Sequence, residues 1–297
     1  MNDTANAPES RVTLPVLQAK KARGEKIVAL TAYDFPTAQI LDEAGVDLIL
    51  VGDSLGMVVL GYDTTMPVTM DDMILHTRPV VRAARRALVI GDMPYFSFHR
   101  SLEDSLSNAA RFVKEAGADG VKIEGATPLR LKLVEALVEA EIPVMGHVGL
   151  TPQSVNRLGG FKVEGTDGEG AQRILRDAQN LIKAGVFSLI LESIPLELAR
   201  AVTERSSVPT IGIGAGPHCD GQILVFHDLA GYSKGYMPKF VKKYADLQAV
   251  LSAAVRAYGR DVKSGRFPDD AHSYHLPKDQ QRGPALRTKA GKGKARA

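Results

Sequence analysis

Short apolar runs rich in β-branched residues recur along the chain, and each run ends in glycine or a polar residue. Continuous apolar runs of this length are typical of buried parallel strands. The predicted strands are residues 27–31, 47–51, 87–91, 120–124, 142–145, 186–191, 208–212 and 221–226.

Segments with helical periodicity, rich in Ala, Leu, Glu and Arg, separate these strands. They cover residues 37–44, 71–86, 102–116, 129–140, 168–184 and 196–205. Three of them end on Ala-Gly, at Gly45, Gly117 and Gly185, where a left-handed C-cap is expected before the next strand. Eight strand–helix units in about 230 residues predict one closed (β/α)8 TIM barrel rather than an open sheet.

The pattern outside these units predicts the ends of the domain. A helix over residues 11–20 is expected to plug the barrel floor, and a helix over residues 241–262 is expected to close the outer ring. We therefore predict one catalytic barrel over residues 12–265, with a flexible N-terminus (1–11) and a flexible basic tail (266–297).

Composition narrows the class of protein. Hydrophobic residues make up 44% and charged residues 24% of the 297 residues, which is typical of a globular chain. No apolar run approaches the roughly 18–20 residues that cross a bilayer, and the polar start lacks a secretory h-region. A single cysteine, Cys219, excludes an internal disulfide framework and Cys-rich metal sites. We expect a cytoplasmic protein without a membrane partner.

The positive net charge belongs to the end of the chain. Residues 278–297 carry a net charge of +6 within a total of +3, so residues 1–277 are mildly acidic at −3. This Gly-, Ala- and Lys-rich end is predicted to be a disordered, solvated tail. A nucleic-acid role for the tail is the alternative, and we expect no nucleic-acid partner.

Charged residues follow several of the predicted strands. In a barrel of this kind the active site lies at the C-terminal ends of the strands, where such residues converge. The residues in question are Asp53, Asp92, Lys122, Glu124, His147 and Glu192.

A cluster of carboxylates favours a bound cation, because carboxylates close together repel one another. Oxygen donors without Cys or paired His favour Mg²⁺ over Zn²⁺. Asp53 and Asp92 are predicted to ligate it directly, and Glu124 directly or through water. Such an ion polarises a carbonyl and stabilises an enolate.

Other interpretations of the same residues remain open. Asp53 and Asp92 also fit N-caps of the following helices. Lys122 shares a strand face with Glu124, so it either contacts a substrate anion or forms a salt bridge to a barrel acid. Glu192 is separated from the carboxylate cluster by the fifth strand. It is either a general base or a carboxylate that supports other site residues.

Two glycine-rich segments follow later strands. Residues 211–216 are placed where many barrels bind phosphate, but tight turns use glycine for steric reasons alone. Residues 146–160 predict a long loop that forms a lid or binding wall. His147 in this loop is either a hydrogen-bond donor to substrate or a structural residue.

Together, several motifs resemble the ketopantoate hydroxymethyltransferase family over residues 12–265. The most specific are Val51-Gly-Asp-Ser-Leu-Gly-Met57, Val121-Lys-Ile-Glu-Gly125 and Gly146-His-Val-Gly-Leu-Thr-Pro-Gln-Ser-Val-Asn156. Others are Thr31-Ala-Tyr-Asp34, Pro67-Val-Thr69, Leu191-Glu192, Gly212-Ile-Gly-Ala-Gly216 and Asp220-Gly-Gln-Ile-Leu-Val225.

The resemblance implies a barrel of the phosphoenolpyruvate/pyruvate type and a specific reaction. A hydroxymethyl group passes from 5,10-methylenetetrahydrofolate to 3-methyl-2-oxobutanoate, giving 2-dehydropantoate for pantothenate and coenzyme A synthesis. It also implies a homo-oligomer, commonly a decamer.

The resemblance also assigns roles to residues of this sequence. Mg²⁺ is bound by Asp53, Asp92 and Glu124. The keto acid is contacted by Asp53, Ser54, Asp92 and Lys122, and Glu192 is the proton acceptor. Ser54 enters through the resemblance alone.

Two other functions fit parts of the sequence. A Mg²⁺-dependent lyase or mutase would share the enolate chemistry, but such lyases commonly carry a cysteine acid near strand five, where this chain has Met145 and His147. A scaffold that binds RNA or membranes through the basic tail would need residues 278–297 rather than the barrel.

Overall fold

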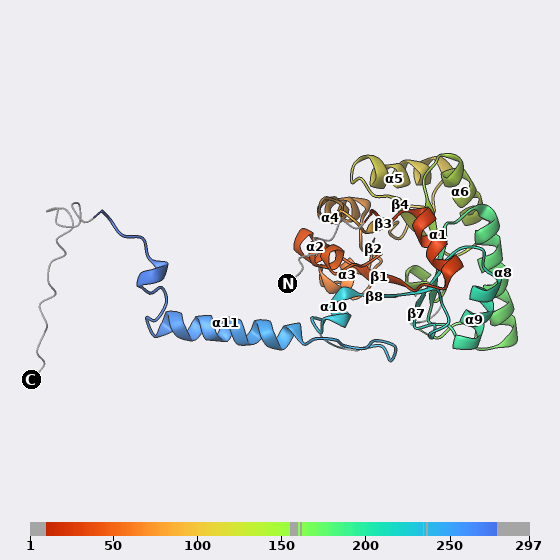
Figure 1. The fold of residues 1–297 in the computed structure, drawn as a ribbon. Helices are drawn as coiled ribbons and strands as arrows, with labels where there is room; N and C mark the ends of the chain where they lie inside the picture. The colour runs from red at the N-terminus through yellow and green to blue at the C-terminus, as the bar shows by residue number, and fades with distance from the viewer. Residues whose placement is uncertain (1–9, 155–159, 161, 234, 236, 278–297) are drawn as a thin grey trace, which may run out of the picture. The chain divides into compact units, whose positions relative to one another are not determined.

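The strands form a closed parallel barrel in which β1 to β8 follow one another in chain order (Figure 1). The structure is a computed structural model that describes residues 10–154, 160, 162–233, 235 and 237–277. The strands are β1 Ile27–Thr31, β2 Leu48–Val51, β3 Leu88–Asp92, β4 Gly120–Glu124, β5 Val144–Gly149, β6 Ser188–Glu192, β7 Thr210–Ile213 and β8 Gly221–Leu224. The predicted barrel is therefore confirmed.

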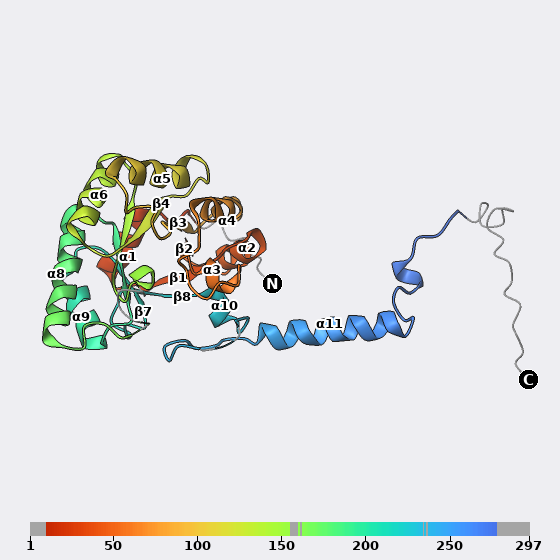
Figure 2. The ribbon, with the colours of Figure 1, turned by 180° about the vertical axis from the view of Figure 1, so that it is seen from behind.

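Helices surround the strands in both views of the fold (Figures 1 and 2). They are α1 Leu14–Arg23, α2 Phe35–Glu43, α3 Leu55–Val58, α4 Met70–Ala83, α5 Leu102–Lys114, α6 Pro128–Glu139, α8 Gly168–Ala184, α9 Leu196–Arg205 and α10 Phe226–Leu229. Gly45, Gly117 and Gly185 have φ angles of 81°, 77° and 101°, so the predicted left-handed caps are present. The short helices α3 and α10 were not predicted.

The barrel interior is a separate apolar cluster closed from below by the N-terminal segment. Strand residues such as Leu48, Ile90 and Ile190 fill the interior, and Val12 and Leu17 pack beneath them. Leu17 lies on α1 and is 1% exposed. The predicted plug of the floor is confirmed, although the helix begins at Leu14 rather than at residue 11.

Strand β5 runs four residues beyond its predicted end at residue 145. It pairs in parallel with β6 from Met145↔Ser188 to Gly149↔Glu192. This pairing places His147 within a strand rather than in a loop. Of the predicted loop over residues 146–160, the residues 155–159 lie outside the described part.

Residues 246–277 belong to a second compact unit. It contains α11 (Leu247–Lys263) and the 3-10 turn Asp270–His272. The predicted start of α11 at residue 241 is wrong, because the Asp246 side chain caps the helix by accepting a hydrogen bond from Ala249 N. None of the residues of α11 is buried. Closure of the outer ring by this helix, and the domain limits at 12 and 265, stay predictions.

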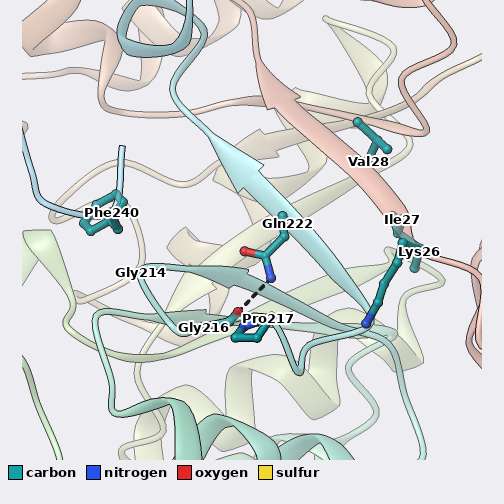
Figure 3. A pocket seen from close by; sticks show the side chains of 8 residues that line it. All are labelled: Lys26, Ile27, Val28, Gly214, Gly216, Pro217, Gln222 and Phe240. Carbon is teal, nitrogen blue, oxygen red and sulfur yellow. Dashed lines mark hydrogen bonds between the residues drawn. The ribbon is translucent and has the colours of Figure 1, made fainter. Parts of the chain in front are cut away.

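The outer faces of β1 and β8 border a cavity of about 500 Å³ (Figure 3). Lys26, Val28, Gln222 and Phe240 line it, and Gln222 Nε2 donates to Gly216 O at 2.9 Å. Val28 lies within β1 and is nevertheless 51% exposed. Parallel strands are normally covered on both faces, so this wall is expected to be covered by a further element.

Candidate active site

Strand register brings the predicted site residues to one rim. Asp92 pairs with Lys122 across β3 and β4, Glu124 pairs with His147 across β4 and β5, and Glu192 pairs with Gly149 across β5 and β6. Asp53 follows β2, and its backbone N donates to Asp92 Oδ2 at 3.1 Å. All of these residues therefore lie at the carboxyl end of the barrel, as predicted.

Lys122 bridges two carboxylates of this rim. Its Nζ lies 3.0 Å from Asp92 Oδ2 and 3.0 Å from Glu124 Oε1. All three side chains are buried, with exposures of 2–5%. The salt-bridge interpretation of Lys122 is thus confirmed, while contact with a substrate stays a prediction.

The N-cap interpretation of Asp53 and Asp92 is wrong. Helix α3 begins after Ser54, and helix α5 begins after Ser101, whose side chain accepts from Asp104 N. Asp53 and Asp92 are instead buried, at 4% and 2% exposure. Their burial has no helix-capping explanation.

Gln153 ties the loop after β5 to the acidic residues, and sequence reasoning missed it. Its Nε2 donates to Asp53 Oδ2 and to Met93 O, both at 2.9 Å, and its backbone N donates to Glu124 Oε2 at 3.1 Å. The residue lies on the 3-10 turn Pro152–Ser154. The long loop predicted after the fifth strand was the signal that one of its residues, such as Gln153, could reach the acidic residues.

The charges at this rim are unequally stabilised. Burial, and then the Asp92 carboxylate, raise the pKa of Asp53 well above its usual range. Burial also raises the pKa of Asp92, against the opposing effect of Lys122. Burial raises the pKa of Glu124 as well, but Lys122 and His147 outweigh it and lower that pKa to about 2. Asp53 therefore carries the least stabilised negative charge.

His147 lies between Glu124 and Glu192. Its Nε2 is 3.2 Å from Glu192 Oε2, and its Nδ1 is 3.6 Å from Glu124 Oε1. Burial and the Lys122 charge lower the pKa of His147, but the two glutamates outweigh them and raise it to about 9. Glu192 is the more accessible partner, with 16% of its side chain exposed. Glu192 therefore lies at the edge of the site, in contact with the His147 imidazole.

Ser54 is positioned by a buried tyrosine. Tyr33 Oη and Ser54 Oγ are 2.8 Å apart, and Tyr33 is 1% exposed. Burial raises the pKa of Tyr33, so the phenol stays protonated. Tyr33 comes from the segment after β1, which extends the site to a further strand.

Two features flagged in the sequence have structural roles. At Gly216, with φ 74°, an added Cβ would lie 2.5 Å from Leu196 Cβ, so glycine is required for close packing. Cys219 is buried, and burial raises its pKa, which disfavours a thiolate nucleophile. The steric interpretation of residues 211–216 is thereby supported.

The fit of these carboxylates to a metal ion depends on donor chemistry. Within the described residues, no three His, Cys, Asp or Glu side chains are arranged as a ready metal site. Lys122 Nζ contacts both Asp92 and Glu124 in this arrangement. Asp92 Oδ1 is nevertheless buried without a hydrogen-bond partner in the described part of the chain. That oxygen and the raised pKa of Asp53 are what a hard cation would satisfy.

Solved structures with the same fold are remote in sequence. A 2,3-dimethylmalate lyase, a PEP mutase/isocitrate lyase superfamily member, has a TM-score of 0.56, with 16% identity over 92% of each chain. Phosphonopyruvate hydrolase in complex with oxalate and Mg²⁺ has a TM-score of 0.58, with 14% identity over 90% of this chain and 93% of its own. These likenesses show the fold alone. Among the described helices, none is long and apolar enough to cross a membrane.

Sequence relatives are much closer than these structures. The 3-methyl-2-oxobutanoate hydroxymethyltransferase of Thermoanaerobacter sp. (strain X514) is 55% identical over 92% of this chain and 100% of its own. That of Moorella thermoacetica is 55% identical over 90% and 99%. The sequence model of the ketopantoate hydroxymethyltransferase family matches residues 11–270. With this match spanning the whole barrel, the chain belongs to the ketopantoate hydroxymethyltransferase family.

Proposed function

We propose that this enzyme transfers a hydroxymethyl group from 5,10-methylenetetrahydrofolate to 3-methyl-2-oxobutanoate, giving 2-dehydropantoate for pantothenate synthesis. The observation that carries the proposal is the 55% identity, over 92% of this chain, to a relative named 3-methyl-2-oxobutanoate hydroxymethyltransferase. The buried acidic rim supports it, because the reaction needs a base and stabilised negative charge at one place.

The keto acid is bound at the acidic rim. Lys122 offers its ammonium to the oxygens of the substrate, and Ser54, held by Tyr33, offers a hydroxyl. Asp53 and Asp92 complete the contacts to substrate. Such preorganised groups stabilise charge as it develops without reorganising at the moment of reaction.

Asp53, Asp92 and Glu124 are the residues that would hold Mg²⁺. Two observations support this assignment: Asp92 Oδ1 has no hydrogen-bond partner among the described residues, and burial and Asp92 disfavour the charged form of Asp53. The phosphonopyruvate hydrolase of the same fold, which forms a complex with oxalate and Mg²⁺, is consistent with it. When bound, the ion would polarise the ketone of the keto acid.

Glu192 is the proposed general base. The C3–H bond of the keto acid breaks, the proton goes to a Glu192 carboxylate oxygen, and the electron pair forms the enolate. C3 then bonds to the methylene carbon of the folate, and both bonds from that carbon to the folate nitrogens break as water supplies the hydroxyl oxygen. The two nitrogens take up the proton removed from C3 and a proton from water, and tetrahydrofolate leaves. The His147 imidazole, 3.2 Å from Glu192, limits the directions in which this carboxylate can point.

The proposal also includes the assembly and location of the enzyme. We propose a homo-oligomer, expected to be a decamer, that acts in the cytoplasm. The outer wall of β1 and β8 is consistent with an assembly if a second copy, rather than α11 of the same chain, covers Val28 and the cavity beside it. Light scattering on the full chain tests it: a Val28→Asp variant is expected to form smaller species, and an unchanged mass would remove this wall from the interface.

The rival lyase or mutase has less support. The solved lyases and hydrolases share only 13–18% identity with this chain, whereas relatives named as hydroxymethyltransferases share 52–55%. Strand β5 presents Met145 and His147 rather than a cysteine acid. Cleavage of a malate- or phosphonate-type substrate would revive this alternative.

One assay tests the proposal directly. The chain is incubated with 3-methyl-2-oxobutanoate and methylenetetrahydrofolate, and 2-dehydropantoate is measured with Mg²⁺, after EDTA, and after Mg²⁺ is restored. We expect product that is lost with EDTA and recovered with Mg²⁺. Equal turnover in EDTA would overturn the metal assignment, and no product in any condition would overturn the function.

A further inference from the structure

Two exposed aromatic rings lie beside the acidic rim without an assigned role. They come from the segment between β3 and α5, which begins directly after Asp92 (Figure 1). Tyr95 is 37% and Phe96 is 55% exposed. Aromatic rings bring large apolar area to an interface when they are covered, so exposed rings beside a site mark a surface for a flat ligand.

The turn that carries Phe96 is strained and firmly held. Phe96 has a φ angle of 68°, in the left-handed region that aromatic residues seldom adopt. The turn is fixed by Ser97, whose N and Oγ both donate to Pro94 O, at 3.1 Å and 2.7 Å. Asn108 of α5 in turn donates to Ser97 O at 2.7 Å. Strain maintained in this way occurs at ligand-binding sites, where it presents one side chain in one direction.

The exposed rings are continuous with a buried aromatic cluster. The rings of Phe96 and His99 are stacked, with centroids 6.0 Å apart and planes 11° apart. Tyr95 and Phe98 also contact His99, with centroid distances of 5.2 Å and 4.4 Å. Phe96 and Tyr95 therefore present a supported aromatic surface rather than free side chains.

This surface is joined to the acidic site on its inner side. Met93 O, two residues before Tyr95, accepts a hydrogen bond from Gln153, which also binds Asp53. His99 lies within electrostatic reach of Glu124, whose carboxylate acts to raise the His99 pKa. Burial and Arg130 outweigh that effect and lower the pKa of His99 to about 4, so its ring is neutral near pH 7.

Two arginines lie close to the same aromatic cluster. Arg130 is centred 5.2 Å from the Phe98 ring, and its Nη2 is 2.6 Å from His99 Nε2. The Arg100 side chain is 66% exposed, with Asp104 3.5 Å away. A flat ring system with an anionic tail is complementary to this arrangement.

We propose that Tyr95 and Phe96 form the stacking surface for the pterin ring system of the folate co-substrate, with the arginines on the side of its carboxylate tail. This inference rests on the proposed function, which needs a second substrate at the same rim. The keto acid is small and aliphatic and has no use for two exposed aromatic rings.

Two substitutions at Phe96 distinguish the contribution of the aromatic ring from that of an apolar side chain in general. Phe96→Leu keeps an apolar side chain but removes the ring, and Phe96→Tyr keeps the ring. Both retain the same backbone strain, because neither introduces glycine. Phe267→Leu, at a 38% exposed ring in the second unit, is the matched control.

Calorimetric titration of the full chain with tetrahydrofolate measures the surface directly. For Phe96→Leu we expect the dissociation constant to rise about tenfold, the factor typical of one lost aromatic stack. Phe96→Tyr and Phe267→Leu are expected to bind as the wild type does. In turnover, the KM for methylenetetrahydrofolate should rise for Phe96→Leu alone, with the KM for the keto acid unchanged.

Hydrogen exchange at C3 of the keto acid, without folate, distinguishes a binding role from a structural one. Exchange is expected to be unchanged in Phe96→Leu. Unchanged tetrahydrofolate affinity in Phe96→Leu, or a parallel loss of C3 exchange, would overturn the inference while leaving the proposed function intact. Tetrahydrofolate binding that depends on Phe96, in a wild type that forms no 2-dehydropantoate, would overturn the proposed function instead.

Discussion

The two ends of the barrel use aspartates in opposite ways. At the amino end, Asp47, Asp119 and Asp220 each precede a strand. Each accepts a hydrogen bond from a backbone N of a neighbouring strand residue, namely Val28, Val89 and Thr210. Each also forms a salt bridge at 2.7–2.8 Å: Asp47 with Lys20, Asp119 with Arg11 and Asp220 with Lys21.

In the described part of the chain, the carboxyl end does not give each carboxylate a cation of its own. Among the described residues, Asp53, Asp92 and Glu124 are arranged around Lys122, and Asp92 Oδ1 has no hydrogen-bond partner. A buried charge without its own partner destabilises the fold, whereas a paired and hydrogen-bonded one is tolerated. The amino end is therefore built for stability and the carboxyl end for a ligand, as in other barrels of this type.

The largest effect is expected for Glu192→Gln. If the carboxyl end contains the proposed base, C3 exchange of 3-methyl-2-oxobutanoate without folate should fall by about 10²–10⁴, the usual contribution of a general base. Binding of the keto acid should persist. NMR of the substrate in deuterated buffer measures the exchange. Undiminished exchange would remove Glu192 from the chemistry.

Next come matched substitutions at the two ends, Asp53→Asn and Asp47→Asn. In EDTA at pH 7, Asp53→Asn removes a buried carboxyl group whose charged form is disfavoured by burial and by Asp92, and it should raise the unfolding free energy. Asp47→Asn leaves Lys20 without its partner and should lower it, so that the variants differ by about 3 kcal/mol. Denaturant unfolding measures both.

Activity should follow the opposite order in these two variants. Asp53→Asn is expected to be inactive and to lose stabilisation by Mg²⁺, whereas Asp47→Asn is expected to keep both. Destabilisation by Asp53→Asn in EDTA would contradict the comparison between the two ends.

An effect of at most comparable size is expected in the pH dependence of stability without metal. In the folded state the pKa of His147 is raised from 6.5 to about 9. The protonated imidazole therefore makes its full contribution to the stability of the folded state below pH 6.5. That contribution is lost as the pH rises from 6.5 to 9, at no more than about 1.4 kcal/mol per pH unit. Asp53, with its raised pKa, acts in the same direction, and its effect begins above pH 3.8. Thermal unfolding in EDTA measures the decrease in stability between pH 6.5 and 9. This decrease should be smaller in His147→Gln than in the wild type. An equal decrease in both would contradict the His147 contribution.

The smallest effect is expected for the basic tail. Removal of residues 278–297, which lie outside the described part of the chain, should leave turnover unchanged, because the proposed chemistry belongs to the barrel. Steady-state rates at matched protein concentration measure this. A clear loss of turnover would instead assign a function to the tail, and RNA or vesicle binding by the full chain would identify it.

Much of the architecture was predictable because strand and helix patterns are local. The apolar runs predicted eight strands, and Gly45, Gly117 and Gly185 predicted helix ends that have the expected positive φ angles. The wrong start of α11 has a local cause as well, since the cap at Asp246 overrides the helical pattern before it.

The site was predictable only in part. Asp53, Asp92, Lys122 and Glu124 were found because they follow strands, whose carboxyl ends must meet in a parallel barrel. Gln153 was missed because its contacts depend on how a long loop folds back over the rim, 100 residues from Asp53. The position of His147 between two glutamates was missed because it depends on β5 running to Gly149.

Local patterns and motifs were therefore enough to predict the kind of fold, the end of the barrel that holds the charges and the family to which the chain belongs. Tertiary structure decided which charges are paired, which oxygen lacks a partner and which rings are exposed beside the site. The physical reason is range. Backbone preference and hydrophobic periodicity act over a few residues, whereas charge balance and burial depend on strand register and loop closure between distant parts of the chain.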